Sequence, residues 1–220
     1  EDKPLGNAGA LFRLRDRLSE DFLLINADVI FDIDLERFVD FHKDTEGLVT
    51  LFTHPNNHPY DSGLILSDKD KTITAWLSKE EKRPAYYKNR VNAGLHIIVP
   101  EVLDLTKERL IKEYGHLPER VDLDRDILKP LAGNGMMYCY DSCEYVRDMG
   151  TPKRYEQVCR DMVLGHIGRK NLKKEQKAIF LDRDGTINKE VGFLSDIDRF
   201  ELLPGVGDAI YKINLSGYLA

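Results

Sequence analysis

Three aspartates follow short apolar runs in a way that suggests metal-assisted chemistry on phosphate groups. Asp28 comes after the apolar stretch 22–25, and Asp182 and Asp184 come after the stretch 178–181. A short apolar run that ends in a carboxylate is typical of a buried parallel strand, and ligands of open α/β sheets bind at the carboxyl ends of their strands. The sequence therefore predicts two acidic sites, one near each end of the chain.

A fourth aspartate, Asp148, lies just past a strand predicted over 144–146 and could meet Asp28 at one cleft. Mg²⁺ prefers oxygen ligands and retains several waters, so two converging carboxylates are enough to hold it. Either aspartate alone is more often a helix cap or a loop residue. The prediction of a magnesium site therefore depends on the pair.

Asp182 and Asp184 are two positions apart, so in an extended chain both side chains leave on the same side. Phosphoryl transfer through a carboxylate uses this arrangement: one acid attacks phosphorus, a second protonates the leaving oxygen, and Mg²⁺ reduces their mutual repulsion. Gly185 allows a sharp turn, and Arg183 is expected to point the other way. A D-x-D pair on a surface loop is, however, more often a solvated turn.

The segments that must position these acids alternate between strands and helices, which predicts an α/β fold. Strands are expected over 22–28, 48–53, 63–66, 73–76, 91–99, 136–140 and 144–146, and helices over 10–18, 35–42, 122–131 and 152–164. The pair 63–66 and 73–76 forms a hairpin beside a parallel core. Asp34 and Thr151 are the expected N-caps, and His42 is expected in the core.

Composition narrows the function classes. The 220 residues carry 32 basic and 38 acidic side chains, a net charge of −6, and 42% are hydrophobic. This balance argues against a nucleic-acid surface and suits small phosphorylated substrates that carry a metal ion. Cys139, Cys143 and Cys159 lack the paired spacing of a zinc site, so a reducing cytoplasm is expected. No apolar run approaches the length of a membrane span.

Residues 1–164 contain a set of short motifs in a fixed order. They are Pro4-Leu5-Gly6-Asn7-Ala8-Gly9, Asn26-Ala27-Asp28, Glu81-Lys82 before Pro84, Val91-Asn92-Ala93-Gly94 and Asp148-Met149-Gly150-Thr151-Pro152. In order and spacing these motifs resemble those of the sugar-1-phosphate nucleotidyltransferases, above all the guanylyltransferases of mannose 1-phosphate or heptose 1-phosphate. The resemblance implies a Rossmann-like sheet with a small antiparallel part.

The resemblance also implies substrates and site residues. The implied roles are nucleotide binding for Leu5 and Gly6, sugar-phosphate binding for Glu81, Lys82, Asn92 and Gly94, and Mg²⁺ coordination for Asp28 and Asp148. The partners would be an NTP, with GTP favoured, and a sugar phosphate. An oxygen of the sugar phosphate would attack the α-phosphorus of the nucleotide, so no side-chain nucleophile is required.

Several features depart from the family pattern. The family has Thr in place of Asn7, Gly in place of Ala27, and no residue corresponding to Arg83 between the lysine and the proline. The family's glycine-rich loop, G-x-G-T-R, cradles the triphosphate and does not occur in these 220 residues. We therefore expect the given chain to bind nucleotide weakly and to transfer little.

The second acidic stretch resembles another family. Asp182-Arg183-Asp184-Gly185-Thr186, after its apolar run, is similar to the first motif of the haloacid-dehalogenase (HAD) phosphatases, in the branch acting on heptose 1,7-bisphosphate or histidinol phosphate. This resemblance implies that Asp182 is the nucleophile, that Asp184 is the acid/base, and that both contribute to a Mg²⁺ site. Residues 178–220 would form only the first βα portion of a HAD-type Rossmannoid domain.

The predicted organisation is a nucleotidyltransferase domain over 1–164, a basic linker over 165–177 and the start of a phosphatase domain over 178–220. The two activities would be consecutive, because removal of one phosphate from heptose 1,7-bisphosphate gives the heptose 1-phosphate that a guanylyltransferase would activate. Two alternatives stay open: a mannose-type enzyme with an unrelated phosphatase, and a non-catalytic regulatory module. A homo-oligomer is also left open.

Overall fold

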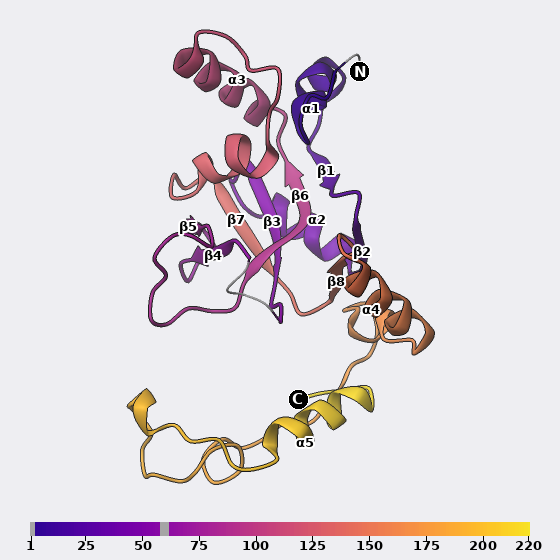
Figure 1. Cartoon of the computed structure of the whole chain (residues 1–220), viewed down its shortest axis with the longest axis vertical. Coiled ribbons are helices and arrows are strands. Elements are labelled where there is room, and N and C mark those ends of the chain that lie inside the picture. The colour runs from indigo at the N-terminus through magenta and orange to yellow at the C-terminus, as the bar shows by residue number, and fades with distance from the viewer. Residues whose placement is uncertain (1–2, 58–61) are drawn as a thin grey trace.

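A six-stranded mixed sheet forms the centre of the computed structural model, which describes residues 3–57 and 62–220 (Figure 1). Its strands are β1 (Phe22–Ile25), β3 (Val49–His54), β4 (Leu64–Ser67), β5 (Ile73–Leu77), β6 (Val91–Ile98) and β7 (Met137–Asp141). The order is β5-β4-β6-β3-β7, and β1 also pairs with β6. Among the described strands of this sheet, only β3 and β7 pair in parallel. The predicted α/β class is confirmed, but antiparallel pairing dominates the sheet.

The stretch 22–25, expected to be a buried parallel strand, is an antiparallel strand with one face open. β1 runs opposite to β6 along its whole length. Phe22 and Leu24 pack against the core, whereas Leu23 and Ile25 are each 38% exposed. The expectation was wrong because a short apolar run fits several strand environments and carries no information about which distant strand will pair with it.

The described residues form five α-helices, which are α1 (Gly9–Leu14), α2 (Leu35–Lys43), α3 (Glu101–Tyr114), α4 (Pro152–Val163) and α5 (Val206–Leu215). Asp34 accepts a hydrogen bond from the backbone N–H of Arg37, and Thr151 accepts one from that of Arg154, each at 3.3 Å. Both bonds satisfy an N–H that the first helical turn leaves without a partner, so the two predicted N-caps are confirmed.

The segment 122–131, expected to be one helix, is irregular. It is π-helical over Leu123–Leu128 and forms a 3-10 helix over Lys129–Leu131. Pro130 has no N–H to donate, so a regular helix cannot continue through it. Shorter 3-10 turns lie at Arg15–Arg17, Ile167–Lys170 and Ile197–Arg199.

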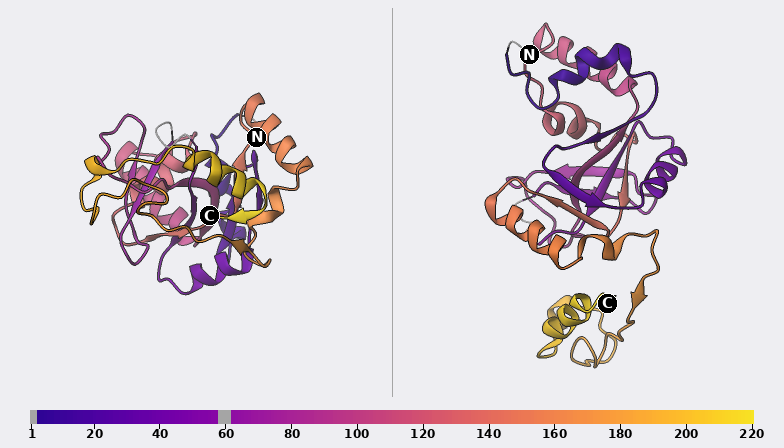
Figure 2. Two further views of the ribbon diagram at one scale, coloured as in Figure 1. Left: turned by 90° about the horizontal axis from the view of Figure 1, so that it is seen from below. Right: turned by 90° about the vertical axis from the view of Figure 1, so that its right-hand side faces the viewer.

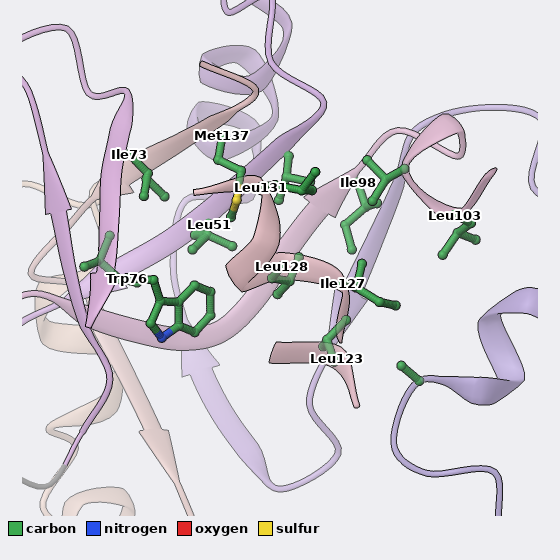
Figure 3. Packing of buried hydrophobic residues seen from close by; sticks show 14 of the residues in the cluster. Leu51, Ile73, Trp76, Ile98, Leu103, Leu123, Ile127, Leu128, Leu131 and Met137 are labelled. Atoms are coloured by element: carbon green, nitrogen blue, oxygen red, sulfur yellow. The ribbon is translucent and has the colours of Figure 1, made fainter. Parts of the chain in front are cut away.

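Hydrophobic side chains are buried on both faces of the sheet. Leu51 and Phe52 are neighbours on β3 and point to opposite faces, and each belongs to a different buried cluster. The larger cluster joins β3, β5 and β7 to α3 and the irregular helix, with Trp76 and Ile127 among its members (Figure 3). The smaller cluster joins Phe38 of α2 to β3 and β6. The two clusters therefore cover the two faces of the sheet with buried apolar side chains.

His42 belongs to the core, as predicted. Its side chain is 4% exposed, and Nδ1 lies 2.7 Å from Thr50 Oγ1. Burial lowers the pKa of His42, although nearby Asp21 opposes this shift. A histidine with a satisfied hydrogen bond inside the core has no need of a ligand to explain it.

A separate two-stranded sheet stands beside the central one. It pairs β2 (Val29–Asp32) with β8 (Tyr145–Asp148) in antiparallel register, so that Val29 lies opposite Asp148. β2 follows β1 almost directly, whereas β8 leads into α4. This small sheet therefore joins the beginning and the end of the first 164 residues.

The basic stretch 165–177, expected to be a solvated linker, packs in part against the first 164 residues. Asn171 is 7% exposed and donates to Asp32, and the backbone N–H of Leu172 donates to Glu144 Oε1 at 2.9 Å. Lys173 pairs with Glu36 at 3.0 Å. The acidic residues of β2 and α2 hold this stretch in place, and sequence spacing alone does not reveal such a contact.

The last part of the chain lies apart from the sheet (Figure 2). Its β9 (Lys177–Ala178) and β10 (Tyr218–Leu219) pair in parallel over two residues. Helix α5 lies between these two strands in the sequence. The apolar run expected to be a buried strand is exposed, with Ile179 at 36% and Phe180 at 96%. That prediction was wrong because β9 pairs with β10 over only two residues, and no other described strand pairs with β9. The apolar run 178–181 is therefore left largely uncovered.

Candidate active site

A cleft of about 940 Å³ opens beside β6 and is lined by Asp28 and Asp148, the two aspartates predicted to meet. Asn92 and Gly94 of β6, both predicted to contact a sugar phosphate, also line this cleft. Residues from the loop after β3, from β8 and from α4 complete its walls. Four of the predicted site residues are thus brought together.

Asp28 and Asp148 approach each other through the small antiparallel sheet. Asp28 directly precedes β2, and Asp148 is the last residue of β8, opposite Val29. The backbone N–H of Met149 donates to the carbonyl oxygen of Asp28 at 2.7 Å. Both acids were expected just past strands, and only the strand before Asp28 was expected to be parallel. They meet instead because neighbouring positions of an antiparallel ladder face each other.

Gly150 lies between the two carboxylates. A Cβ placed on this glycine would be 3.2 Å from Asp28 Oδ2 and 3.4 Å from Asp148 Oδ1. One carboxylate oxygen of each aspartate therefore lies close to Gly150. The contact would be tight for any larger residue. The missing side chain therefore leaves room between the two acids.

Part of the cleft wall is basic, and the motif comparison did not identify it. Lys153, Arg154 and Arg160 of α4 line the cleft together with Arg147 of β8. Arg154 Nη1 lies 2.7 Å from Asp148 Oδ1. Lys153 and Arg160 are seven positions apart and so share one face of a helix, which is a signal that the sequence contained. The cleft therefore offers cations for phosphate oxygens next to acids for a metal ion.

Asn92 and Gly94 owe their position to an irregularity in β6. Leu51 of β3 pairs with His96, and two residues later Thr53 pairs with Asn92, so β6 contains two more residues than β3 over this interval. Gly94 has φ of +79° and donates its N–H to Asn92 Oδ1 at 3.2 Å. Bulges of this kind redirect side chains and are frequent beside functional sites.

Asp124 is a further acid in the cleft, and the motif comparison did not identify it. Asp124 as a whole is exposed, but partial desolvation of its carboxyl by the surrounding chain raises its pKa to about 6, and the neighbouring charge of Asp122 adds to the shift. A carboxyl that titrates near neutral pH beside a cleft is a candidate for proton transfer or for contact with a substrate hydroxyl.

Glu81 and Lys82, predicted to contact the sugar phosphate, do not line this cleft. Glu81 Oε2 pairs with Lys129 Nζ at 2.5 Å and accepts from the Ser78 N–H at 2.7 Å. The hydrogen bond from Lys129 is the main reason why the pKa of Glu81 falls to about 2. Lys82 is exposed. The structure therefore does not bring this pair to the other predicted site residues.

Leu5 and Gly6, predicted to bind the nucleotide, lie in a tight turn against Val121. The Val121 N–H donates to the Leu5 carbonyl at 3.0 Å, and Gly6 has φ of +80°. A Cβ on Gly6 would lie 2.4 Å from the Val121 carbonyl oxygen, so the turn requires glycine. Neither residue lines the cleft. Packing against Val121 is sufficient to explain both.

Asp182 and Asp184 lie in the exposed C-terminal part, away from the cleft. Arg183, expected to point away, binds both carboxylate oxygens of Asp184 at 2.8 and 3.0 Å. This contact, together with a hydrogen bond from Asn188, lowers the pKa of Asp184. The expectation about Arg183 was wrong because this stretch turns rather than extends: the N–H groups of Ile187 and Asn188 donate to the Arg183 carbonyl at 2.8 and 3.0 Å.

Within residues 3–57 and 62–220, no group of three or more histidine, cysteine or acidic side chains is arranged to hold a metal ion. The pair Asp28 and Asp148 nevertheless fits Mg²⁺, because this ion commonly takes one or two carboxylates and completes its shell with waters and substrate phosphates.

Over the same described residues, no helix has the length and apolar character needed to cross a membrane.

Sequence and structure comparisons agree with this architecture. A family model described as nucleotidyl transferase matches residues 1–163. Mannose-1-phosphate guanylyltransferase of Mycobacterium tuberculosis is 28% identical over 170 residues, which cover 75% of this chain and 44% of that protein. Mannose-1-phosphate guanyltransferase of Debaryomyces hansenii is 30% identical over 160 residues, covering 70% and 41%. The chain thus spans less than half the length of these relatives.

The fold is also similar to that of solved structures. HddC from Yersinia pseudotuberculosis superimposes with a TM-score of 0.56 at 18% identity, over 74% of this chain and 64% of that one. A second structure of that protein, in complex with GMP-PN, gives a TM-score of 0.55. Because the family model matches residues 1–163, which is most of the chain, the chain belongs to the nucleotidyl transferase family.

Proposed function

We propose that the protein transfers a nucleotidyl group, with guanylyl favoured, from an NTP to a sugar 1-phosphate bound in the cleft beside β6. The observation that carries this proposal is the approach of Asp28 and Asp148 around Gly150. Two carboxylates beside a basic wall suit a reaction between two phosphate-bearing molecules. The relatives named as guanylyltransferases of mannose 1-phosphate support guanylyl as the transferred group and mannose 1-phosphate as acceptor. Heptose 1-phosphate as an alternative acceptor rests on the motif resemblance alone.

In this reaction a phosphate oxygen of the sugar 1-phosphate forms a bond to the α-phosphorus of the NTP. The bond from that phosphorus to the bridging oxygen breaks, and pyrophosphate leaves with the electron pair. Asp28 and Asp148 would hold Mg²⁺, which when bound offsets the repulsion between the anionic reactants. Lys153 and Arg160 would bind phosphate oxygens, and Asn92 would orient the sugar. The chain contributes mainly position and charge, and no covalent intermediate is needed.

Transfer of labelled GMP from GTP to mannose 1-phosphate and to heptose 1-phosphate, with the full-length protein, tests this proposal. Asp28→Asn and Asp148→Asn should each reduce the rate about 100-fold or more, because each removes a carboxylate that would hold Mg²⁺. Asp70→Asn is the matched control, since Asp70 is an exposed aspartate in the turn between β4 and β5. Wild-type rates in Asp28→Asn would contradict the proposal, and absence of all transfer would favour a regulatory module.

A second activity, hydrolysis of a phosphate monoester by the complete C-terminal domain, is proposed on a narrower observation. Residues 183–187 form a turn with Gly185 at φ of +76°, and β9, α5 and β10 follow the βαβ order with the two strands parallel. Asp182 would be the nucleophile. Asp184 would need release from Arg183 before it could donate a proton, because their contact favours the charged carboxylate.

Asp182→Asn separates the two activities. In the full-length protein it should abolish phosphate release from heptose 1,7-bisphosphate while leaving nucleotidyl transfer within twofold of wild type. Asp208→Asn, an exposed aspartate of α5 in the same region, is the control. Loss of both activities in Asp182→Asn would contradict two independent sites, and unchanged phosphate release would contradict the nucleophile assignment.

A further inference from the structure

His96 is a buried histidine for which neither the motifs nor the proposed reaction has a role. It lies on β6 with its side chain fully buried. Nε2 lies 3.1 Å from Asn92 Oδ1, and Nδ1 makes no hydrogen bond of acceptable geometry with any described residue. Because Nε2 of this buried imidazole contacts Asn92, which lines the cleft, His96 is a candidate for a functional role.

The contact between His96 and Asn92 exists only because β6 is irregular. In a regular strand, residues four positions apart are separated by about 13 Å along the strand axis. The two additional residues of β6, with Gly94 at φ of +79°, bring the two side chains within hydrogen-bonding distance. Gly94 in turn is fixed from outside, because its carbonyl oxygen accepts from the Asn26 N–H at 2.9 Å.

The hydrogen bonds determine the orientation of the Asn92 carboxamide relative to Gly94 and His96. The Gly94 N–H can only donate, so the Asn92 atom 3.2 Å from it must be the carbonyl oxygen Oδ1. His96 Nε2 lies 3.1 Å from the same oxygen, so a hydrogen bond between them requires the Nε2–H tautomer. Burial lowers the pKa of His96 to about 4, and the backbone of Leu24 opposes this shift only in part, so the ring is neutral near pH 7.

With Oδ1 accepting two hydrogen bonds, the remaining polar group of Asn92 is its NH2. No described residue accepts from Nδ2, and Asn92 lines the cleft close to Asp28 and the basic wall. We propose that His96 is a positioning residue that fixes the Asn92 carboxamide so that its NH2 donates to an oxygen of the bound sugar phosphate. This inference rests on the proposed function and assigns His96 a role in sugar-phosphate affinity.

Two variants of the full chain and one spectroscopic measurement test this role. His96→Gln keeps an N–H donor, whereas His96→Phe keeps a planar ring without one. Long-range ¹⁵N–¹H correlation should show the Nε2–H tautomer, and the Asn92 side-chain amide signals should shift in His96→Phe but little in His96→Gln. His96→Phe should weaken mannose 1-phosphate binding about tenfold, as expected for one lost hydrogen bond, with GTP binding within twofold of wild type.

Other results would overturn the inference. These are an Nδ1–H tautomer, a His96→Phe protein that binds mannose 1-phosphate like wild type, or equal weakening of GTP and mannose 1-phosphate. If His96→Phe does not fold, the tautomer and recovery of affinity to within about threefold in His96→Gln decide the matter. If wild type binds no sugar phosphate, the proposed function fails and the ligand assignment with it. An Nε2–H tautomer would then show that the His96–Asn92 contact itself is sound.

Discussion

Residues 1–164 and residues 178–220 begin from the same sequence pattern, an apolar run followed by aspartate, and bury it very differently. Phe22 and Leu24 of the first run pack against the larger core cluster, whereas Phe180 of the second is 96% exposed. Within 178–220, all of which the structure describes, Asn188 is the only buried residue. The run became a core strand only where distant segments covered it.

This difference separates local from long-range causes of structure. In both regions helices and turns form where the local residues favour them, and α5 is a regular helix although no residue of it is buried. A core requires strands and helices from far along the chain, as when β6 pairs with β1, β3 and β4. The comparison predicts that substitutions will affect stability strongly in the first region and weakly in the second.

The largest expected difference comes from two phenylalanines. Phe38 is fully buried, with its ring edge-on to Phe52 at 5.5 Å. Phe38→Ala should lower the free energy of unfolding by about 3–5 kcal/mol, because it removes apolar contacts and leaves a cavity. Phe180→Ala, the matched control, should change it by less than about 0.5 kcal/mol. Urea denaturation followed by circular dichroism measures both, and similar losses would contradict the comparison.

Glu144 lies where the basic stretch 165–177 packs against the first region, and its removal should have the next largest effect. This carboxylate is 4% exposed and accepts from the Asp34 N–H at 2.7 Å, the Leu172 N–H at 2.9 Å and the Ser142 hydroxyl at 3.0 Å. Glu144→Ala should cost about 1–3 kcal/mol, because it leaves buried donors without an acceptor. Limited proteolysis should also show faster cleavage at residues 171–177.

The control for Glu144 is Glu190, an exposed glutamate that accepts from the Gly192 N–H at 2.8 Å. Glu190→Ala should leave both unfolding and the proteolysis pattern of 171–177 unchanged. If Glu144→Ala behaved in the same way, the contact between the basic stretch and the first region would contribute nothing to stability.

Acid should destabilise the first region through His96. Its pKa is lowered to about 4 by burial, so the unfolded chain, with a histidine pKa near 6.5, binds the proton first as pH falls. Stability is therefore complete above pH 6.5 and decreases between pH 6.5 and pH 4, by about 2 kcal/mol at pH 5. The difference in pH dependence between wild type and His96→Phe isolates this contribution. Identical pH profiles would show that His96 is not buried as a neutral ring.

Helix capping gives the smallest expected difference. Thr151→Ala removes the acceptor for the Arg154 N–H at the start of α4 and should cost about 1 kcal/mol. Asp196 caps the 3-10 turn of the second region by accepting from the Asp198 N–H at 3.1 Å. Asp196→Ala should cost less than about 0.5 kcal/mol in global unfolding, because that turn supports no core. Thermal unfolding of both variants compares the two caps.

Much of the local structure followed from residue types. The caps at Asp34 and Thr151 and the hairpin of β4 and β5 are where the sequence places them, because neighbouring residues determine them. The pair Asp28 and Asp148 also meets in one cleft. Glu81 and Lys82 do not reach it, since Lys129 and Ser78, which hold Glu81, come from parts of the chain that a motif does not include.

By itself, the sequence determined the α/β class, the helix starts and the presence of acids suited to phosphate chemistry, because each depends on residue type and on neighbours a few positions away. Only the tertiary structure decided that β1 pairs antiparallel with β6, that α4 adds a basic wall, and that the irregular β6 joins His96 to Asn92. Those features depend on contacts between segments far apart in the chain, which sequence periodicity does not record.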